Sequence, residues 1–329
     1  MKTMADINIA ELFSKVEKCK NAIIVGHSHP DGDCVGSAVA LAALIESLGG
    51  KAEIIFPEKA PRRLEFLLEQ RAELAELPEN LDDYNIIGID LASPVQMASL
   101  REAIESRVKL RIDHHDISIS YAKYELVDAK AAAAGEIIFD LWEYALNEGK
   151  VKEITTEAQT ALFGSISSDT GCFKYANVTP DTHIRAAKLI KMGAPSAEIN
   201  RLLFDTKDAN QLKAEGIAHV KFETFLDGKI SGVAIELSDY EGGLNIKDFE
   251  TAIDVVRSVR GAKCAVCVKA SPTPGAFRAS LRANDDTDVS KIAAVFGGGG
   301  HIRAAGCTVL ATSAKEALDM IIAEFKKIM

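Results

Sequence analysis

The segment "NAIIVGHSHPDGDCVGSAVALAALIESLGG", residues 21–50, contains the pattern that decides the fold. Its first part, residues 21–27, is a short apolar run that predicts a buried strand. Residues 34–50 have helical periodicity and end in Gly-Gly, a typical signal for the end of a helix. The polar turn between them holds Asp31 and Asp33, so the sequence predicts acidic side chains at the carboxyl end of a strand.

This strand–turn–helix unit gives two local expectations. We expect Asp33 to cap the helix that begins near Cys34, because a carboxylate accepts hydrogen bonds from the free amides of a helix N-terminus. Capping would explain one acid of the turn but not the others. We also expect the small side chains of Gly36 and Ser37 to let the helix pack close to the edge of the sheet.

Apolar strands continue to alternate with helical segments along the N-terminal half of the chain. The next apolar runs are 52–56, 85–90 and 108–113, and a helical segment lies near 95–106. Strands that are apolar throughout and alternate with helices predict an α/β fold, in which a parallel sheet is covered by helices on both faces. In such folds ligands bind at the carboxyl ends of the strands.

The rest of the chain predicts a mostly helical region followed by a smaller α/β domain. The helical region, 134–191, is interrupted by a polar turn at 167–175 and is followed by connecting helices near 195–218. Beyond it we expect a hairpin at 218–237, strands at 262–270 and 275–283, and helices near 288–296 and 313–328. We therefore expect an N-terminal domain at 1–195, a helical linker at 196–215 and a C-terminal domain at 216–329, with the active site in the cleft between the two domains.

Composition places the chain among ordinary globular proteins. Its 329 residues suffice for two cores, and its hydrophobic and charged contents of 47% and 26% are typical. We find no signal peptide and no apolar run of the roughly 18–20 residues that span a bilayer, so we expect a soluble cytoplasmic protein without a membrane partner. Among six scattered cysteines, Cys264 and Cys267 form a lone C-x-x-C in a strand-like run, which indicates core residues rather than a zinc site.

The charge of the chain is unevenly distributed. A formal net charge of -10 argues against a protein that coats long nucleic acid by bulk electrostatics. Between Arg257 and Arg303, however, eight Lys/Arg and three Asp give a local charge of 8 − 3 = +5. A basic surface of this kind suits a small anionic substrate, although chance clustering on a solvated face would give the same composition.

Ligand-capable side chains gather at the predicted strand ends and in the polar turn. They are His27, Asp31, Asp33, Asp90, His114 and Asp169. The set offers nitrogen and oxygen donors without a thiolate, which argues against structural zinc and suits Mn²⁺, with Mg²⁺ or Co²⁺ as alternatives. Six ligands suit two ions that share a carboxylate, about 3.5–4 Å apart. Taken singly, an Asp at a strand end is commonly a turn residue and a lone His is commonly structural.

Five short motifs in this order resemble the DHH phosphoesterase superfamily. They are "HSHPDGD" at 27–33, which fits H-x-x-P-D-x-D, then "GIDLAS" at 88–93, "DHH" at 113–115, "SSDTGCFKY" at 167–175 and "FGGGGHIRAAG" at 296–306. The last is similar to the glycine-rich signature of the DHH-associated C-terminal domain. The layout resembles the bacterial nanoRNase/pAp-phosphatase subfamily, relatives of RecJ, and the likeness covers about residues 20–310.

The resemblance implies a two-metal phosphoesterase centre. One ion would be held by His27, Asp31 and Asp90, and the second by Asp33, Asp90, His114 and Asp169. A hydroxide that bridges the two ions would attack phosphorus.

The resemblance also assigns catalytic roles around these ligands, beginning with Asp90 as the bridge between the ions. His115 would contact the scissile phosphate or hold the metal ligands in place. Asp113 would orient His114 through its other ring nitrogen. His29 occupies a variable position of its motif and is expected not to be a ligand.

In the C-terminal domain the resemblance implies a site for the substrate. Gly298, Gly299 and Gly300 would let backbone amides approach an anion, and His301 would donate to a phosphate. Arg282 is similar to an arginine that grips the non-scissile phosphate, a task that suits the guanidinium fork. Taken alone, the glycines would favour a plain flexible turn.

The implied activity is hydrolysis of short oligoribonucleotides and dinucleotides such as pApA to mononucleotides, and of pAp to AMP as a further reaction. One alternative is a pyrophosphatase or exopolyphosphatase of the same superfamily, although we find no Ser-Arg-Lys type motif in the C-terminal domain. Another is a non-catalytic nucleotide-binding relative, although all six ligand positions are filled. The physiological substrate, the polarity of attack and the formation of a homodimer are left open.

Overall fold

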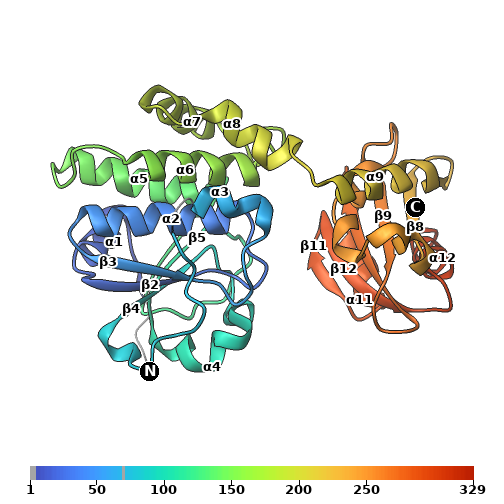
Figure 1. The fold of residues 1–329 in the computed structure, drawn as a ribbon, viewed down its shortest axis with the longest axis horizontal. Coiled ribbons are helices and arrows are strands. Elements are labelled where there is room, and N and C mark those ends of the chain that lie inside the picture. Colours follow the sequence, from blue (N-terminus) through green and yellow to red (C-terminus); the bar gives the residue numbers. More distant parts are fainter. Residues whose placement is uncertain (1–4, 69–70) are drawn as a thin grey trace. The chain divides into compact units, whose positions relative to one another are not determined.

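A computed structural model describes residues 5–68 and 71–329 of the chain (Figure 1). The chain divides into two compact units, Met1–Thr206 and Lys207–Met329. The boundary between them lies within the segment 196–215, whose role as a linker stays a prediction. Because each unit has its own sheet and its own cores, we describe each by itself.

A six-stranded sheet, in which every pair of neighbouring strands is parallel, forms the centre of the N-terminal unit. Its strands are β1 (Ala5–Asp6), β2 (Asn21–Val25), β3 (Lys51–Ile55), β4 (Asn85–Ile89), β5 (Val108–Asp113) and β6 (Tyr124–Val127), in the order β1-β6-β5-β4-β2-β3. The predicted parallel sheet is confirmed, while the two short strands β1 and β6 were not predicted.

Helices cover both faces of this sheet, but in different ways. On one face lie α1 (Ile9–Val16), α2 (Gly32–Ser47) and α5 (Ala134–Asn147), with α6 (Thr156–Asp169) packed on α2 and α7 (Pro180–Met192) beyond it (Figure 1). The other face is covered by short elements: η2 (Leu81–Asp83), η3 (Pro94–Leu100), α4 (Arg101–Ile104) and η4 (Glu105–Arg107). The unit is completed by η1 (Arg62–Leu64), α3 (Glu65–Leu68), α8 (Ser196–Asn200) and η5 (Arg201–Asp205).

The closest helix packing in this unit is between α2 and α6. A Cβ atom at Gly36 would lie 2.4 Å from the carbonyl oxygen of Ala161, so only glycine permits this approach. Beside it, the hydroxyl oxygens of Ser37 and Ser165 are 3.3 Å apart. Gly36 and Ser37 were expected to let the helix pack close to the edge of the sheet, but the close approach that they permit is to α6. Almost the whole of α2 is buried.

The C-terminal unit is built on a second, mixed sheet of six strands. These are β7 (Glu223–Phe225), β8 (Ile230–Ile235), β9 (Cys264–Ala270), β10 (Ala276–Ala283), β11 (Gly299–His301) and β12 (Ala304–Leu310), in the order β11-β12-β10-β9-β8-β7. Only β8 and β9 pair in parallel. The predicted hairpin is confirmed as the antiparallel pair β7–β8, whereas β11 and β12 were not predicted.

Helices also cover both faces of this second sheet. One core contains α9 (Ala209–Lys221) and α10 (Ala252–Arg257), bordered by η6 (Leu237–Gly243) and η7 (Ile246–Phe249). The opposite core contains α11 (Val289–Val295) and α12 (Ala314–Phe325). Cys264 belongs to one core and Cys267 to the other, which confirms that this C-x-x-C pair is core material on alternate faces of β9. In the described part of the chain, no helix combines the length and the apolar character needed to cross a membrane.

Candidate metal centre

The candidate site lies at the carboxyl ends of β2, β4 and β5. β2 and β4 are neighbours in the sheet, but the chain continues from β2 to β3 on one side and from β4 to β5 on the other. The strand order therefore reverses between β2 and β4, and the strand ends at such a switch point are where α/β folds bind ligands. His27 and Asp31 follow β2, Asp90 follows β4, and His114 follows β5.

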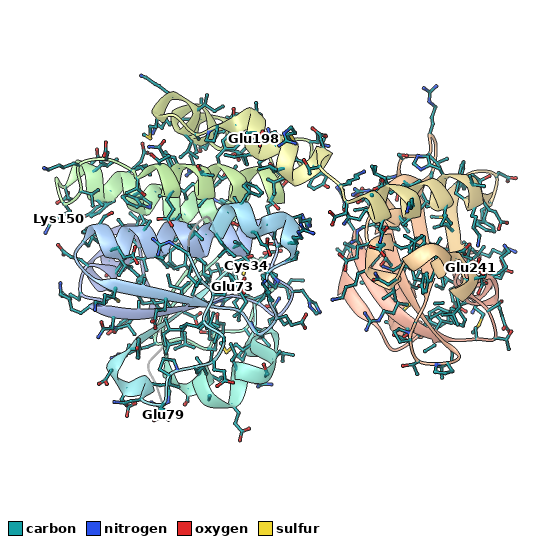
Figure 2. All side chains as sticks on the ribbon, viewed as in Figure 1. Cys34, Glu73, Glu79, Lys150, Glu198 and Glu241 are labelled. Atoms are coloured by element: carbon teal, nitrogen blue, oxygen red, sulfur yellow. The ribbon has the colours of Figure 1, made fainter. Side chains whose placement is uncertain are left out.

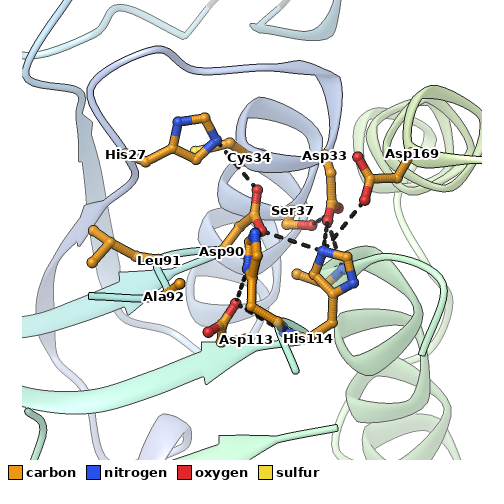
Figure 3. A network of polar contacts seen from close by, with 12 residues as sticks. His27, Asp33, Cys34, Ser37, Asp90, Leu91, Ala92, Asp113, His114 and Asp169 are labelled. Atoms are coloured by element: carbon orange, nitrogen blue, oxygen red, sulfur yellow. Dashed lines mark hydrogen bonds and ion pairs between the residues drawn. The ribbon is translucent and has the colours of Figure 1, made fainter. Parts of the chain in front are cut away.

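Asp90 occupies the centre of the site (Figure 3). Its Oδ2 lies 3.5 Å from Nε2 of His27, and its Oδ1 lies 3.5 Å from Nε2 of His114. The side chain is 2% exposed, and Oδ1 accepts no hydrogen bond from the described residues. Asp90 also has a positive φ of 49°, a strained conformation for an aspartate that is typical of functional sites.

His114 is surrounded by three carboxylates. Its Nε2 lies 3.5 Å from Oδ2 of Asp33 and 3.3 Å from Oδ2 of Asp169, in addition to its contact with Asp90. A ring nitrogen can direct at most one hydrogen bond, so three acceptors around one nitrogen form a ligand set rather than a hydrogen-bonded pair. Figure 3 shows Asp33 and Asp169 pointing toward this ring from α2 and α6.

Asp169 is the last residue of α6, not a turn residue as expected. The helical ladder continues past it, since the amide of Thr170 donates to the carbonyl of Ile166 at 3.2 Å. The helix ends because Gly171, Cys172 and Phe173 all have positive φ. The predicted polar turn therefore begins after Asp169, which leaves this side chain on a rigid helix.

Near His27 the second acid is Asp31. Nε2 of His27 lies 3.8 Å from Oδ1 of Asp31. The same oxygen accepts hydrogen bonds of 3.0 Å from the amides of Asp33 and Cys34, so Asp31 is the N-cap of α2. The expectation that Asp33 caps this helix was wrong, because α2 begins at Gly32 and places Asp33 inside its first turn.

Asp33 instead caps a different helix. It is fully buried, and its two oxygens accept hydrogen bonds from the amides of Ala134 at 2.6 Å and Gly135 at 3.1 Å, at the start of α5. The hydroxyls of Ser37 and Ser165 donate to it as well, at 2.8 and 2.5 Å. The residue before α5, an alanine, offers no side-chain cap, so Asp33 fixes α5 and the candidate ligand set together.

Asp113 orients the second histidine of the DHH motif rather than the first. Its Oδ1 lies 2.7 Å from Nδ1 of His115 and accepts the backbone amides of His114 and His115 at 2.9 and 3.3 Å. The predicted contact between Asp113 and the ring of His114 was therefore wrong. Nδ1 of His114 faces the carbonyl of Ala131 instead, 3.3 Å away, because its ring turns toward α6.

Burial and neighbouring charges together shift the pKa values of the acids and histidines in this cluster. Burial raises the pKa of Asp33 to about 6, and the charge of Asp90 adds to the effect. Burial would also raise the pKa of Asp90, but the contacts of this carboxylate with His114 and His27 outweigh the effect of burial and hold the pKa below its usual range. For His114, burial acts to lower the pKa, yet the surrounding acids raise it to about 11.

The residues therefore fit a divalent cation. Burial, followed by the charges of Asp33, Asp31 and Asp90, raises the pKa of Asp169 well above its ordinary value. This carboxylate is thus disfavoured as an anion, and a cation at His114 would relieve the repulsion. Among the described residues, three groups of side chains bring ligand atoms within 4.8 Å of one another, and Asp90 belongs to two of them. His29 lies outside them and pairs with Glu58 at 2.9 Å on the surface.

Comparison with known proteins agrees with this geometry. Residues 21–166 match the N-terminal domain of the DHH family, and residues 229–327 match the DHHA1 domain. The chain therefore contains a DHH-type N-terminal domain and a DHHA1 domain. It is similar to the bifunctional oligoribonuclease and PAP phosphatase of Thermus thermophilus, with 27% identity over 95% of this chain and 91% of that protein.

Two further comparisons show how widely the likeness extends. A manganese-dependent inorganic pyrophosphatase of Methanocaldococcus jannaschii is 28% identical over 66% of this chain and 73% of that protein. The crystal structure of an exopolyphosphatase-related protein from Bacteroides fragilis has the same fold, with a TM-score of 0.86 at 18% identity over 97% of this chain and 96% of that one.

Behind the DHH motif lies a residue that sequence reasoning missed. Arg111 is 1% exposed and pairs with Asp113 and, at 3.4 Å, with Glu125. It also donates to the carbonyls of Ile119 at 3.2 Å and Ala92 at 3.5 Å, so it holds the loops that follow β4 and β5. The available signal was a charged residue between two apolar residues, Leu110 and Ile112, in a strand predicted to be buried.

In the DHHA1 domain the glycine-rich segment has a clear structural role. The amide of Gly298 donates to the carbonyl of Ala293 at 2.9 Å, so it is committed to the end of α11. A Cβ at Gly298 would lie 2.2 Å from the carbonyl of Gly306, and one at Gly300 would lie 2.5 Å from that of Ala304. Close pairing of β11 with β12 thus requires two glycines, whereas a Cβ at Gly299 would meet no described atom within 4 Å.

The other predicted substrate residues are in the same sheet. Arg282 is half-buried on β10, donates to the carbonyl of Leu281 at 3.0 Å and lies near Asp254. On β10 it shares a face with Arg278 and Ser280, since alternate residues of a strand point to the same side. The side chain of His301 lies outside the described parts of the chain.

Proposed function

We propose that the chain is a phosphoesterase that requires two divalent metal ions, most favourably Mn²⁺. It hydrolyses short oligoribonucleotides and dinucleotides such as pApA to mononucleotides, and pAp to AMP. The observation that carries the proposal is Asp90, a buried carboxylate whose oxygens face His27 and His114 separately. A side chain in this position suits a bridge between two ions.

The histidine nitrogens and carboxylate oxygens of the site suit two divalent ions of the class that prefers oxygen ligands. We assign His27, Asp31 and Asp90 to one ion, and Asp33, Asp90, His114 and Asp169 to the other. The unsatisfied Oδ1 of Asp90 supports the fit, because a buried carboxylate oxygen without a hydrogen bond is costly unless a cation compensates it. Bound divalent ions supply Lewis acidity, lowering the pKa of water and neutralising charge on a phosphoryl group. The manganese dependence of the pyrophosphatase relative supports Mn²⁺.

The chain's own groups then bind and orient the substrate. His115 is 24% exposed at the side chain, and its Nδ1 lies 2.7 Å from Oδ1 of Asp113, so we assign its oriented imidazole to the scissile phosphate. Burial acts to lower the pKa of His115, but the contact with Asp113 and the charge of Asp90 outweigh it and raise the pKa, which favours the cationic ring near an anion. Arg111 in turn holds Asp113 and thereby fixes the direction of the imidazole.

The DHHA1 domain supplies selectivity in this proposal. We assign Arg282 to the non-scissile phosphate, with the open backbone at Gly299, the neighbouring backbone of Gly300 and the imidazole of His301 as further anion contacts. The cleft between the domains, which would admit only short substrates, and a homodimer both stay predictions. The cytoplasmic location also stays a prediction. Because the amide of Gly298 donates to the carbonyl of Ala293, the predicted role of Gly298 would rest on its backbone conformation and not on that amide.

A pyrophosphatase activity is the second candidate, because an inorganic pyrophosphatase resembles 66% of the chain. One assay of product identity distinguishes hydrolysis of short nucleotides from hydrolysis of pyrophosphate. The purified protein with Mn²⁺ is offered pApA, a five-nucleotide RNA, pAp and pyrophosphate side by side, with Asp90→Asn as the control. We expect AMP from pApA and pAp, with little cleavage of pyrophosphate. Rapid pyrophosphate cleavage with inert nucleotides would overturn the assignment of substrate while keeping the metal chemistry.

A further inference from the structure

The metal centre contains a sulfur atom that the oxygen and nitrogen ligand set does not use. Cys34 is the third residue of α2, directly after Asp33, and its side chain is fully buried. A nitrogen of His27, the sulfur of Cys34 and an oxygen of Asp90 all lie within 4.8 Å of one another. Figure 2 marks Cys34 inside the N-terminal unit, and Figure 3 shows it next to the ring of His27.

The backbone next to the site leaves room for this thiol. A Cβ atom at Gly26 would lie only 2.3 Å from Sγ of Cys34, and 2.7 Å from the ring of Phe56. Any larger residue before His27 would therefore displace the sulfur. The glycine and the helix start together place Sγ at the carboxyl end of β2, on the same side as the imidazole.

The carboxylate of Asp90 is the second ligand-capable group at this place. Asp90 is 2% exposed, and its Oδ2 lies 3.5 Å from Nε2 of His27, whereas its Oδ1, on the side of His114, accepts no hydrogen bond from the described residues. Oδ1 of Asp31 lies 3.8 Å from Nε2 of His27, so a second carboxylate lies beside this imidazole. One nitrogen, one sulfur and two carboxylates are a donor set that a tetrahedral ion accepts.

We propose that the metal position beside His27 takes Cys34 as a ligand when a thiophilic divalent ion such as Co²⁺, Zn²⁺ or Cd²⁺ binds. The ion displaces the proton of the thiol, which passes to solvent, and no oxidation state changes. Mn²⁺ prefers oxygen and leaves the sulfur protonated. The inference rests on the proposed function only for the existence of the metal centre.

The two metal positions then differ in the ions they select. The groups of described side chains around His114 contain Asp33, Asp169, Asp90 and His115, with no sulfur. Soft ions should therefore collect beside His27, while harder ions keep the position beside His114. The centre would discriminate between metals by position.

The test uses Co²⁺, whose visible absorption reports binding and whose near-ultraviolet charge-transfer band reports a thiolate ligand. Metal-free full-length protein is titrated with Co²⁺ and compared with Cys34→Ser. The control is Cys172→Ser, a partly exposed cysteine in the turn after Asp169. We expect the charge-transfer band in the unaltered protein and in Cys172→Ser, and its loss in Cys34→Ser. Competition should show the preference for Cd²⁺ over Mn²⁺ reduced at least about 10-fold in Cys34→Ser, as for other losses of ligand support.

Each outcome decides something different. Visible cobalt absorption without the charge-transfer band would overturn the role of Cys34 while leaving the metal centre in place. No cobalt absorption at all would overturn both. A band that persists in Cys34→Ser and disappears in Cys172→Ser would also refute the assignment. Should Cys34→Ser fail to fold, the cadmium-113 NMR shift of the unaltered protein gives the same answer, because sulfur donors move it far from the range of oxygen and nitrogen ligands.

Discussion

Nδ1 of His115 lies 2.7 Å from Oδ1 of Asp113, and the other oxygen of that aspartate pairs with Arg111. The second histidine of the DHH motif is thus connected to a buried arginine that also holds the loops after β4 and β5. The positions of the side chains in the metal centre therefore depend on Arg111 as well as on the motif residues.

The first prediction concerns Arg111. Replacing it by methionine removes the cation that Asp113 and Glu125 share in a buried site, so Arg111→Met should lower the free energy of unfolding by about 3–5 kcal/mol. The control is Arg107→Met, which breaks an exposed pair with Asp82 and should cost at most about 1 kcal/mol. Urea unfolding of the metal-free proteins measures both, and equal losses would contradict the role of Arg111.

The second prediction separates two proposed ligands of the same ion. Asp33→Ala leaves the amides of Ala134 and Gly135 without their acceptor, at a cost of about 1–3 kcal/mol for each buried donor. Asp169→Ala removes a carboxylate that its neighbours repel, so it should leave the metal-free protein equally or more stable. Both variants should lose Mn²⁺ affinity. Thermal unfolding and Mn²⁺ titration check the pair, and a large destabilisation by Asp169→Ala would argue against this account.

The third prediction is a pH dependence of the metal-free protein. The folded-state pKa of Asp33 is raised from 3.8 to about 6, and that of His114 from 6.5 to about 11. In both cases the folded protein binds more protons than the unfolded chain, so stability falls as pH rises, between about 4 and 6 for Asp33 and between 6.5 and 11 for His114.

Metal binding should remove this dependence. Because the ions displace protons from the same groups, Mn²⁺ affinity should rise with pH, and saturating Mn²⁺ should flatten the stability profile over the same range. Urea unfolding between pH 5 and 9, with and without Mn²⁺, measures the effect. If the stability of the metal-free protein rises between pH 5 and 9, the acids and histidines of the metal centre do not dominate its pH dependence.

The fourth prediction concerns the substrate contact in the DHHA1 domain. Arg282→Ala should raise KM for pApA and pAp about 10-fold or more, with a smaller effect on kcat, because one charge-assisted contact to phosphate is lost. Arg278→Ala, on the same face of β10 but exposed, is the matched control. Steady-state kinetics of both variants provide the test. A KM that is unchanged in Arg282→Ala would remove the residue from the site.

Much of the site was predictable because parallel strands end at one edge of a sheet. The apolar runs placed His27, Asp90 and His114 at three strand ends, and the structure brings them together. The helix start was not predictable to the residue. Asp31 and Asp33 both make good caps, and the choice depends on α5, whose amides receive Asp33 across the fold.

The contacts that hold the site residues in place could not be predicted from local sequence patterns. Arg111 finds its partners at residues 92, 119 and 125, and only the tertiary structure brings these together. The ring of His115, not that of His114, meets Asp113 because the loop before α5 presents the carbonyl of Ala131 to the first histidine. Strand β11 escaped prediction because its residues, two glycines and a histidine, include no apolar side chain, and β12 begins with small residues that give only a weak strand signal.

The central claim is that Asp90 bridges two ions, and electron paramagnetic resonance of bound Mn²⁺ tests it most directly. With two equivalents of Mn²⁺ the account predicts a magnetically coupled pair, and it predicts loss of the coupling in Asp90→Asn while far-ultraviolet circular dichroism stays unchanged. A spectrum of isolated ions in the unaltered protein, or coupling that survives in Asp90→Asn, would contradict it.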